Sequence, residues 1–458
     1  MLYEKHLSTV DKNASEICAV SDALWDNPEI SFEEYEAARI LTEKLEANGF
    51  TVTRGVANIP TAFTATFGSG APHMGILAEY DGLHGMSQVG EIAEKKSIPG
   101  MDKAHGCGHN LFAAGSLAAA LAVKSYIEET GKGSVTLFGC PAEEGGGGKV
   151  FMARDGIFDG IDAIVSWHPE CMYMVRTRPA LANVKVRYTF KGIAAHAGAN
   201  PHQGRSALDA VELMNVGCNF LREHMPLTAR VHYAILDAGG TAPNMVQSHS
   251  VVSYLIRDVD AASVQDLKGR VDRIAKGAAM MTDTEVEINV TGAYANLITI
   301  PTLQATANEA MHDIPLPIPT EEEMAYGKAL QETINLTAEQ KAKPTFATAV
   351  LDPAPPIAHG GSTDTADVSW CCPTVQMHIG NWVTGTPGHS WQSASQCRGS
   401  YAKKAMLYAG KAVAETILRL MENPELIEKA KIEHKNKIGN GYRCGIPADM
   451  MPPIPQKR

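Results

Sequence analysis

"NLFAAGSLAAALAVKSYI", residues 110–127, is the stretch that most constrains the fold, because it is apolar on nearly every side of a helix. A helix without a polar face belongs inside a domain, and Asn110 is expected to cap it. The strand-like segments around it are TAFTATF (61–67), HMGILAE (73–79), SVTLFGC (134–140) and DAIVSW (162–167). Apolar strands that alternate with helices predict an α/β fold with a mainly parallel sheet and helices on both faces.

The pattern of strands and helices changes near residue 184. The segments are then VKVRYTF (184–190), SALDAVELMNVGCNFL (206–221), ARVHYAI (229–235), VVSYLIRDV (251–259), VQDLKGRVDRIAKGAAMM (264–281) and TEVEINV (284–290). Their order, βαββαβ, is typical of a compact α+β unit. We therefore expect the main domain at 1–183 and 299–458, with an inserted domain at 184–298. The polar, Pro-rich end, residues 423–458, is expected to be a surface extension.

The composition of the chain limits the kinds of molecule that it is expected to bind. The 458 residues carry a formal net charge of -11, and 45% of them are hydrophobic and 20% charged. An acidic chain does not favour nucleic acid or an anionic membrane surface, so we expect a small-molecule partner. No apolar run reaches membrane-spanning length and the first residues do not resemble a signal peptide, which favours a cytoplasmic protein. Nine scattered cysteines predict reduced thiols.

Side chains that bind metals or carry protons follow the expected strands. The carboxyl ends of parallel strands share one edge of a sheet, and ligands bind beyond that edge. Thiolate, imidazole and carboxylate groups gathered there suit a borderline-soft divalent metal, so the sequence predicts a metal site. His389, in the turn GTPGHSW, is a candidate further ligand. The residues after the strands are Asp81, Glu143, Glu144 and His168, and those before the buried helix are Cys107 and His109.

The neighbouring Glu143 and Glu144 are expected to have different roles, because the side chains of adjacent residues diverge. If Glu144 binds the metal, Glu143 points elsewhere in the cleft and can take a proton from metal-activated water. The simpler alternative is a solvated acidic pair in a loop. The glycines 145–148 that follow lack the Lys-Ser/Thr ending of a phosphate-binding loop.

Cys107 has a second possible role as a covalent nucleophile. A helix N-terminus and neighbouring histidines would lower the pKa of its thiol. A bound metal would compete for the same thiolate, so we favour the ligand role.

Taken in order, eight motifs resemble those of the M20 metallopeptidase and amidohydrolase family, in the branch of aminoacylase-like and indole-acetyl-amino-acid hydrolases. The resemblance covers nearly the whole chain. It implies a di-metal hydrolase with a catalytic α/β domain and an inserted lid domain that mediates dimerisation. The motifs are AEYDGL (78–83), GCGHN (106–110), CPAEEGG (140–146), WHP (167–169), GIAAHA (192–197), PNMV (243–246), LIRD (255–258) and GTPGHSW (385–391).

The resemblance also implies a role for each matched residue. Glu143 would be the general base, and Asp81 would orient a ligand imidazole. His196 would reach into the site of a partner subunit, either a second copy or a related chain, and stabilise the oxyanion. Asn244 and Arg257 would hold the substrate, the arginine through its carboxylate. Two divalent ions, Mn or Zn, would be bound by Cys107, His109, Glu144, His168 and His389.

Three of these residues also have simpler interpretations, and the chain differs from the family motifs at two places. Without the resemblance, Arg257 is a solvated strand charge, Asn244 a turn residue and His196 a loop histidine. Many relatives have His-x-Asp where this chain has Glu-Tyr-Asp at 79–81, and Asp where it has Asn110.

The expected reaction is hydrolysis of the amide of an N-acyl or N-aroyl amino acid such as p-aminobenzoyl-glutamate. Dipeptides, N-acetyl amino acids and indole-acyl conjugates are alternative substrates that would use the same machinery. An alternative of another class is a non-catalytic protein that binds such conjugates. A Cys107-dependent hydrolase is a third possibility.

Overall fold

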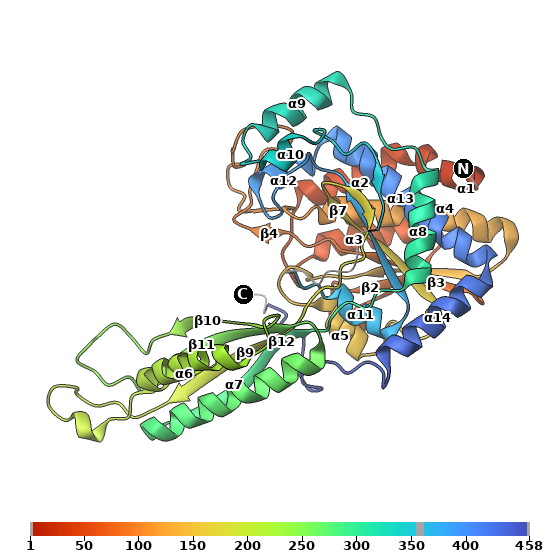
Figure 1. The fold of residues 1–458 in the computed structure, drawn as a ribbon. Coiled ribbons are helices and arrows are strands. Elements are labelled where there is room, and N and C mark those ends of the chain that lie inside the picture. Colours follow the sequence, from red (N-terminus) through yellow and green to blue (C-terminus); the bar gives the residue numbers. More distant parts are fainter. Residues whose placement is uncertain (1–2, 354–360, 456–458) are drawn as a thin grey trace.

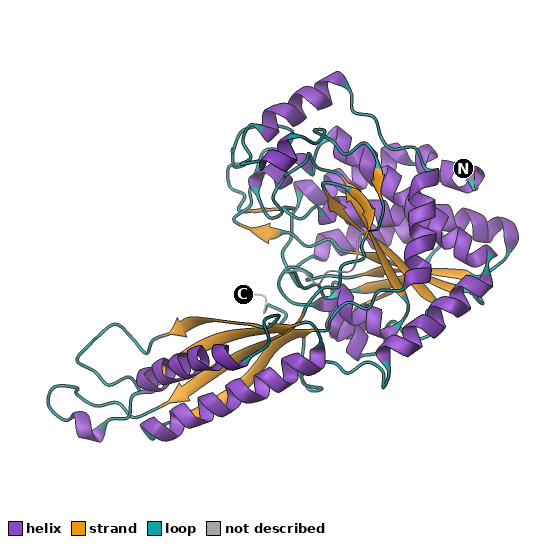
Figure 2. Cartoon of the chain, in the orientation of Figure 1, coloured by secondary structure: helices purple, strands orange, loops and turns teal. Residues whose placement is uncertain are grey.

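The main domain is built on an eight-stranded, largely parallel sheet. The computed structural model describes residues 3–353 and 361–455. The strand order is β1-β2-β6-β3-β7-β14-β8-β13. Strands β6, β3, β7 and β14 run parallel at the centre, whereas β1, β2 and β8 pair antiparallel. Figure 2 shows the strands in orange among purple helices. The bounds are β1 Thr51–Arg54, β2 Phe63–Gly68, β3 His73–Ala78, β6 Ser134–Gly139, β7 Ala163–Glu170, β8 Tyr173–Val175, β13 Val350–Leu351 and β14 Thr374–Gly380. The predicted α/β sheet is confirmed.

Helices cover both faces of this sheet (Figure 1). The connections β3-α4-β6 and β6-α5-β7 cross it in opposite directions, because β6 and β7 flank β3. Since such crossovers are right-handed, α4 and α5 lie on opposite faces. The helices are α1 Glu4–Lys12, α2 Ala14–Asp26, α3 Tyr35–Ala47, α4 His109–Thr130, α5 Gly148–Arg154, α8 Pro301–Asp313, α9 Glu321–Gln331, α10 Ala338–Lys341, α11 Thr365–Cys371, α12 Trp391–Gln396, α13 Ser400–Glu422 and α14 Pro424–Ile438. A two-stranded antiparallel sheet, β4 Leu83–His84 and β5 Lys103–Ala104, completes the main domain.

Helix α4 is the central buried helix, and its predicted cap was wrong. Its N-cap is Gly108, whose φ of 79° lies in the left-handed region that glycine tolerates. Asn110 lies inside the first turn, where its Nδ2 donates to Ser21 Oγ at 3.0 Å and to the carbonyl of Cys397 at 3.0 Å. Among the described helices, α4 alone has the length and hydropathy of a membrane span, and 89% of its apolar window is buried within the protein.

A second sheet, antiparallel and four-stranded, extends from the main domain in the order β10-β11-β9-β12 (Figure 1). Residues of β9 and β11 alternate between buried and accessible, as expected for a sheet covered on one face. Helices α6 and α7 cover that face. The bounds are β9 Ala182–Lys191, α6 Ala207–Leu221, β10 Arg230–Asp237, β11 His249–Asp258, α7 Ala261–Thr282 and β12 Glu285–Tyr294.

The second sheet has two ends that matter for function. We call the end where Arg257 pairs with Asn183 the base, and the end where His249 pairs with Lys191 the tip. The chain enters the sheet at the base from β8 and leaves it there toward α8. Eight residues of strand separate base from tip, which is roughly 26 Å at about 3.3 Å per residue.

The C-terminal residues do not form a surface extension, so that prediction was wrong. Helix α14 packs against α8 and α13, and it buries Ile427, Ala430 and His434. Beyond the helix, Ile446 is also buried. Scattered apolar residues in a polar sequence are enough to hold the segment on the main domain.

Candidate active site

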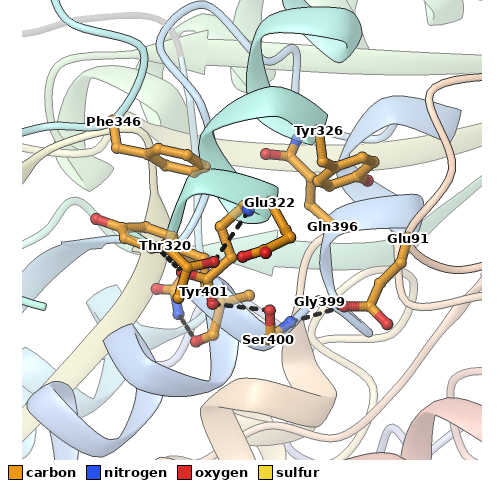
Figure 3. A pocket seen from close by; sticks show the side chains of 12 residues that line it. Glu91, Thr320, Glu322, Tyr326, Phe346, Gln396, Gly399, Ser400 and Tyr401 are labelled. Carbon is orange, nitrogen blue, oxygen red and sulfur yellow. Dashed lines mark hydrogen bonds between the residues drawn. The ribbon is translucent and has the colours of Figure 1, made fainter. Parts of the chain in front are cut away.

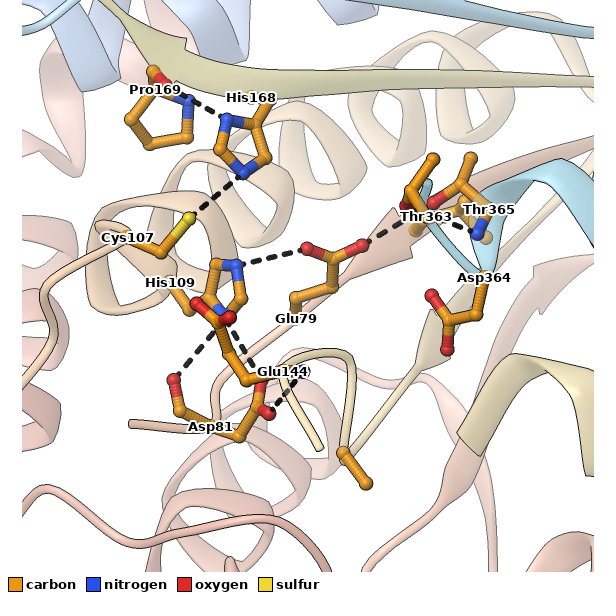
Figure 4. A network of polar contacts seen from close by, with 12 residues as sticks. Glu79, Asp81, Cys107, His109, Glu144, His168, Pro169, Thr363, Asp364 and Thr365 are labelled. Carbon is orange, nitrogen blue, oxygen red and sulfur yellow. Dashed lines mark hydrogen bonds and ion pairs between the residues drawn. The ribbon is translucent and has the colours of Figure 1, made fainter. Parts of the chain in front are cut away.

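The predicted ligands come together at the carboxyl edge of the parallel strands, as Figure 4 shows for several of them. Glu79 and Asp81 follow β3, Glu144 follows β6, and His168 lies within β7. Cys107 stands in the turn before α4, and His389 lies in the loop between β14 and α12. Segments far apart in the sequence therefore supply one site. All nine cysteines are free thiols, as predicted.

Cys107, His109 and His168 form one group of potential ligands. One ligand atom from each lies within 4.8 Å of the others, and Cys107 Sγ is 3.5 Å from His168 Nε2. Asp81 Oδ1 accepts from His109 Nδ1 at 2.8 Å, and the carbonyl of Pro169 accepts from His168 Nδ1 at 2.8 Å. These bonds leave both Nε2 atoms facing the group, which is how ligand imidazoles are usually oriented. Burial lowers the pKa of His168 to about 4, so it is a neutral donor at neutral pH.

Cys107, Glu144 and His389 form a second group, again with ligand atoms within 4.8 Å of one another. Glu144 Oε1 lies 3.1 Å from His389 Nε2. Cys107 belongs to both groups, so two ions would have its thiolate among the residues that could hold them. The chemistry of the donors fits this: thiolate, imidazole and carboxylate all bind zinc, and the last two also accept manganese. Within the described residues, buried Glu144 Oε1 and His109 Nε2 have no hydrogen bond of good geometry, which leaves them available to a metal.

The thiol chemistry of Cys107 differs from expectation. Burial raises the pKa of its thiol well above the ordinary value, against the lowering effect of nearby His109. A helix N-terminus was expected to lower that pKa, but the surrounding protein removes the thiolate from water. Without a metal, Cys107 is therefore a poor nucleophile.

A strained turn precedes the two glutamates of the pair. Ala142 has a φ of 60°, a left-handed conformation that is uncommon for residues other than glycine. Its carbonyl accepts from Gly147 N at 2.7 Å, and its own N–H donates to Glu34 Oε1 at 2.8 Å. After this turn, Glu144 lies with Cys107 and Glu143 lies in a different group.

Glu143 lies with Glu79 and His109, and their ligand atoms are within 4.8 Å of one another. Burial and the charge of Glu79 raise the pKa of Glu143 well above the ordinary value. The alternative of a solvated acidic pair is therefore wrong for this residue. A carboxylate held next to the ligand groups, with a raised pKa, is suited to accept and return a proton.

A buried network that the sequence motifs did not predict lies beside Glu143. Lys149 is fully buried, and its Nζ lies 2.7 Å from Glu79 Oε1 and 2.5 Å from Asp364 Oδ1. Glu79 Oε2 lies 3.2 Å from His109 Nε2. Glu79 could have been noticed in the sequence, because it stands where many relatives have the histidine of His-x-Asp. Lys149 and Asp364 belong to none of the motifs. The lysine offsets the charge of two carboxylates taken from water.

The residues predicted to hold the substrate lie in two different places. Arg257 is at the base of the second sheet and lines a cavity of about 290 Å³ together with Glu144 and Tyr294. His196 and Asn244 are in adjoining loops at the tip, where Ala197 N donates to the carbonyl of Asn244 at 2.9 Å. Within one chain, the length of the strands separates these two residues from Arg257.

Another cavity, of about 220 Å³, lies between α9 and the start of α13 (Figure 3). Phe346 and Tyr401 form one wall, and Glu323 binds Ser400 and Lys404 beside it. None of the predicted site residues lines this cavity, so we place the candidate active site at the ligand groups instead.

With this geometry in place, comparison with known proteins decides the family. Residues 76–379 match the model of peptidase family M20/M25/M40. The chain belongs to this family. The resemblance found in the motifs is thereby confirmed, and M20 membership makes the chain an amide-cleaving hydrolase. The non-catalytic alternative is not retained.

Two M20 relatives and one solved structure match most of the chain. One subunit of the p-aminobenzoyl-glutamate hydrolase of Escherichia coli (strain K12) is 42% identical over 456 residues, 94% of this chain and 95% of that protein. The Xaa-Arg dipeptidase of Homo sapiens is 28% identical over 453 residues, 94% of this chain and 91% of that one. A dinuclear metal-binding M20 peptidase from Bacillus subtilis has a similar fold, with a TM-score of 0.59 and 18% identity over 90% of this chain and 99% of that chain.

Proposed function

We propose that the protein hydrolyses the amide bond of N-acyl or N-aroyl amino acids, with p-aminobenzoyl-glutamate, named for the Escherichia coli relative, as the first candidate substrate. The observation that carries the proposal is the divergence of Glu143 and Glu144. Glu144 lies with Cys107 and His389, whereas Glu143 lies with Glu79 and His109 in a group that does not include Cys107. A site that only bound amino-acid conjugates would not need Glu143, a carboxylate suited to accept a proton.

Two divalent ions, Mn or Zn, would be held by the two groups that share Cys107. One ion would take His109 and His168, and the other would take Glu144 and His389. When bound, the ions would supply a Lewis acid for the scissile carbonyl and an activated water. Asp81 supports both groups, because its Oδ1 orients His109 and its Oδ2 accepts from Glu144 N at 2.9 Å.

Glu143 would move the proton. It would accept a proton from the attacking water and return it to the amine that leaves. The charge of Lys149 helps to lower the pKa of Glu79, and the charges of Glu79 and Asp364 add to burial in raising the pKa of Glu143. Arg257 would pair with the carboxylate of the amino acid at the other side of the cavity that Glu144 lines.

The second domain, residues 184–298, would act as a lid and as the contact with a partner chain. Leu213, Val216 and Phe220 share one face of α6 and are exposed, and β10 is an edge strand of the sheet that α6 covers. Pairing through this surface would bring the tip residues His196 and Asn244 to the site of the partner. The partner would be a second copy or a related chain, and the latter is supported by the Escherichia coli relative, which is named as one subunit of a hydrolase. We also propose a cytoplasmic location, which the free cysteines support.

The test of this function is an assay of the metal-loaded protein. We expect release of the amino acid from p-aminobenzoyl-glutamate, loss of activity with a chelator, and recovery with Mn or Zn. Glu143→Gln should lower kcat by about 10²- to 10⁴-fold with unchanged metal content. Glu144→Gln is the matched control, because it should lose metal as well as activity.

A normal rate for the Glu143 variant would refute the base assignment. Activity that survives the chelator and stops with thiol alkylation would favour the Cys107-dependent hydrolase. Cleavage of a dipeptide but no N-aroyl amino acid would favour the dipeptidase alternative, which the human relative represents.

A further inference from the structure

The C-terminal segment, residues 439–455, returns from α14 to the junction of the two sheets (Figure 1). Tyr442 Oη donates to Asp367 Oδ1 at 2.7 Å, and the other oxygen of Asp367 accepts from Ala295 N at 3.0 Å. Gly445 packs so closely that a Cβ there would lie 2.7 Å from the Cβ of Ala293. The segment is therefore held where the chain leaves the second sheet.

A second set of contacts fixes the same segment to α5. Arg154 Nη1 donates to the carbonyl of Met450 at 2.5 Å, and Met450 N donates to the carbonyl of Pro447 at 3.1 Å. Ile446 has only 6% of its surface exposed. With contacts at residues 442, 445, 446 and 450, the segment has a defined path along the main domain.

This path brings the segment to the cavity that contains Glu144 and Arg257. Ile446 and Met450 line the cavity, and Phe151 of α5 lines it too. The cavity thus has a potential metal ligand, a guanidinium group and an apolar wall. Part of that wall comes from the chain terminus.

We propose that Ile446 and Met450 form the subsite for the side chain of the substrate's amino acid. This inference rests on the proposed function. The amide must lie near Glu144 and the carboxylate near Arg257, so the Cα between them carries its side chain toward the rest of the cavity. Ile446 and Met450 would contact its aliphatic part and exclude water from it. The C-terminal segment would therefore set which amino acid is released.

The experiment compares N-benzoyl-leucine with N-benzoyl-glycine, which has no side chain to contact the subsite. Met450→Ala should lower kcat/KM for the leucine conjugate by about 10-fold, the scale of a few lost methylene contacts. It should leave the glycine conjugate within about twofold. Ile446→Ala should act in the same direction. Met451→Ala is the matched control: Met451 is the next residue, is 62% exposed and does not line the cavity, so neither substrate should change.

An unchanged ratio of the two kcat/KM values in Met450→Ala would overturn the inference. An equal fall for both substrates would also overturn it, because that result indicates a structural role. If Met450→Ala fails to fold, Met450→Gln, which keeps the length of the side chain but makes its end polar, must still lower the ratio of the leucine to the glycine conjugate. Absence of hydrolysis of any N-acyl amino acid by the wild-type protein would instead overturn the proposed function, and the subsite with it.

Discussion

At the scale of single residues, Lys149 carries the buried charge of the site. Its ammonium group offsets Glu79 and Asp364, and all three side chains are out of water. Removing one partner of such a network leaves uncompensated charge, which costs about 3–5 kcal/mol. We expect Lys149→Met to lower the free energy of unfolding by that amount in urea denaturation. The exposed Lys132→Met is the control, and a Lys149 variant as stable as this control would contradict the assignment.

Glu34 makes a pH-dependent contribution to stability. Burial and the charge of Asp81 raise the pKa of its carboxyl from 4.5 to about 8. The stability that comes from protonating it is complete below pH 4.5 and is lost as the pH rises through 8. Glu34→Gln stays neutral, so its stability relative to wild type should increase between pH 5 and pH 9. Denaturation at both pH values measures this, with the exposed Glu285→Gln as control; a constant difference would contradict it.

At the scale of elements, α4 shows which parts of local sequence are informative. Its apolar composition predicted burial correctly, because no orientation of such a helix offers water a polar face. Its start was predicted wrongly, since Asn110 has the chemistry of a cap but is used for contacts with Ser21 and Cys397. Partners this far away in sequence leave no local signal.

The exposed face of helix α6 is where the proposed pairing with a partner chain can be tested. Phe220 is 72% exposed on the face of α6 that also carries Leu213 and Val216, which we call the apolar stripe, and an aspartate there would be costly to bury in an interface. We expect Phe220→Asp to reduce the molar mass measured by light scattering to that of one chain, and activity to fall with it. Met280→Asp on α7, where Met280 is 81% exposed and off the stripe, should change neither. A variant that stays paired would exclude this surface.

At the scale of the whole molecule, the ligand groups join segments from residue 107 to residue 389. Bound metal should therefore stabilise the folded chain as well as activate it, by about 2.7 kcal/mol at a free concentration of 100 times Kd. We expect a chelator to lower the Tm, and Mn or Zn to restore it. Cys107→Ser, which lacks the shared thiolate, should respond much less. An unchanged Tm on chelation of the wild type would argue against this coupling.

The sequence by itself determined the alternation of apolar strands and helices, and it placed ligand-type residues at the ends of the strands. Both depend on chain-local periodicity, which hydrophobic burial enforces. Only the tertiary structure decided which residues surround Glu143 and Glu144, that Lys149 meets Glu79 and Asp364, and that the C-terminal segment lines the cavity of Arg257. The physical reason is that side-chain directions and contacts between distant segments depend on backbone turns and packing, and spacing along the chain does not specify either one.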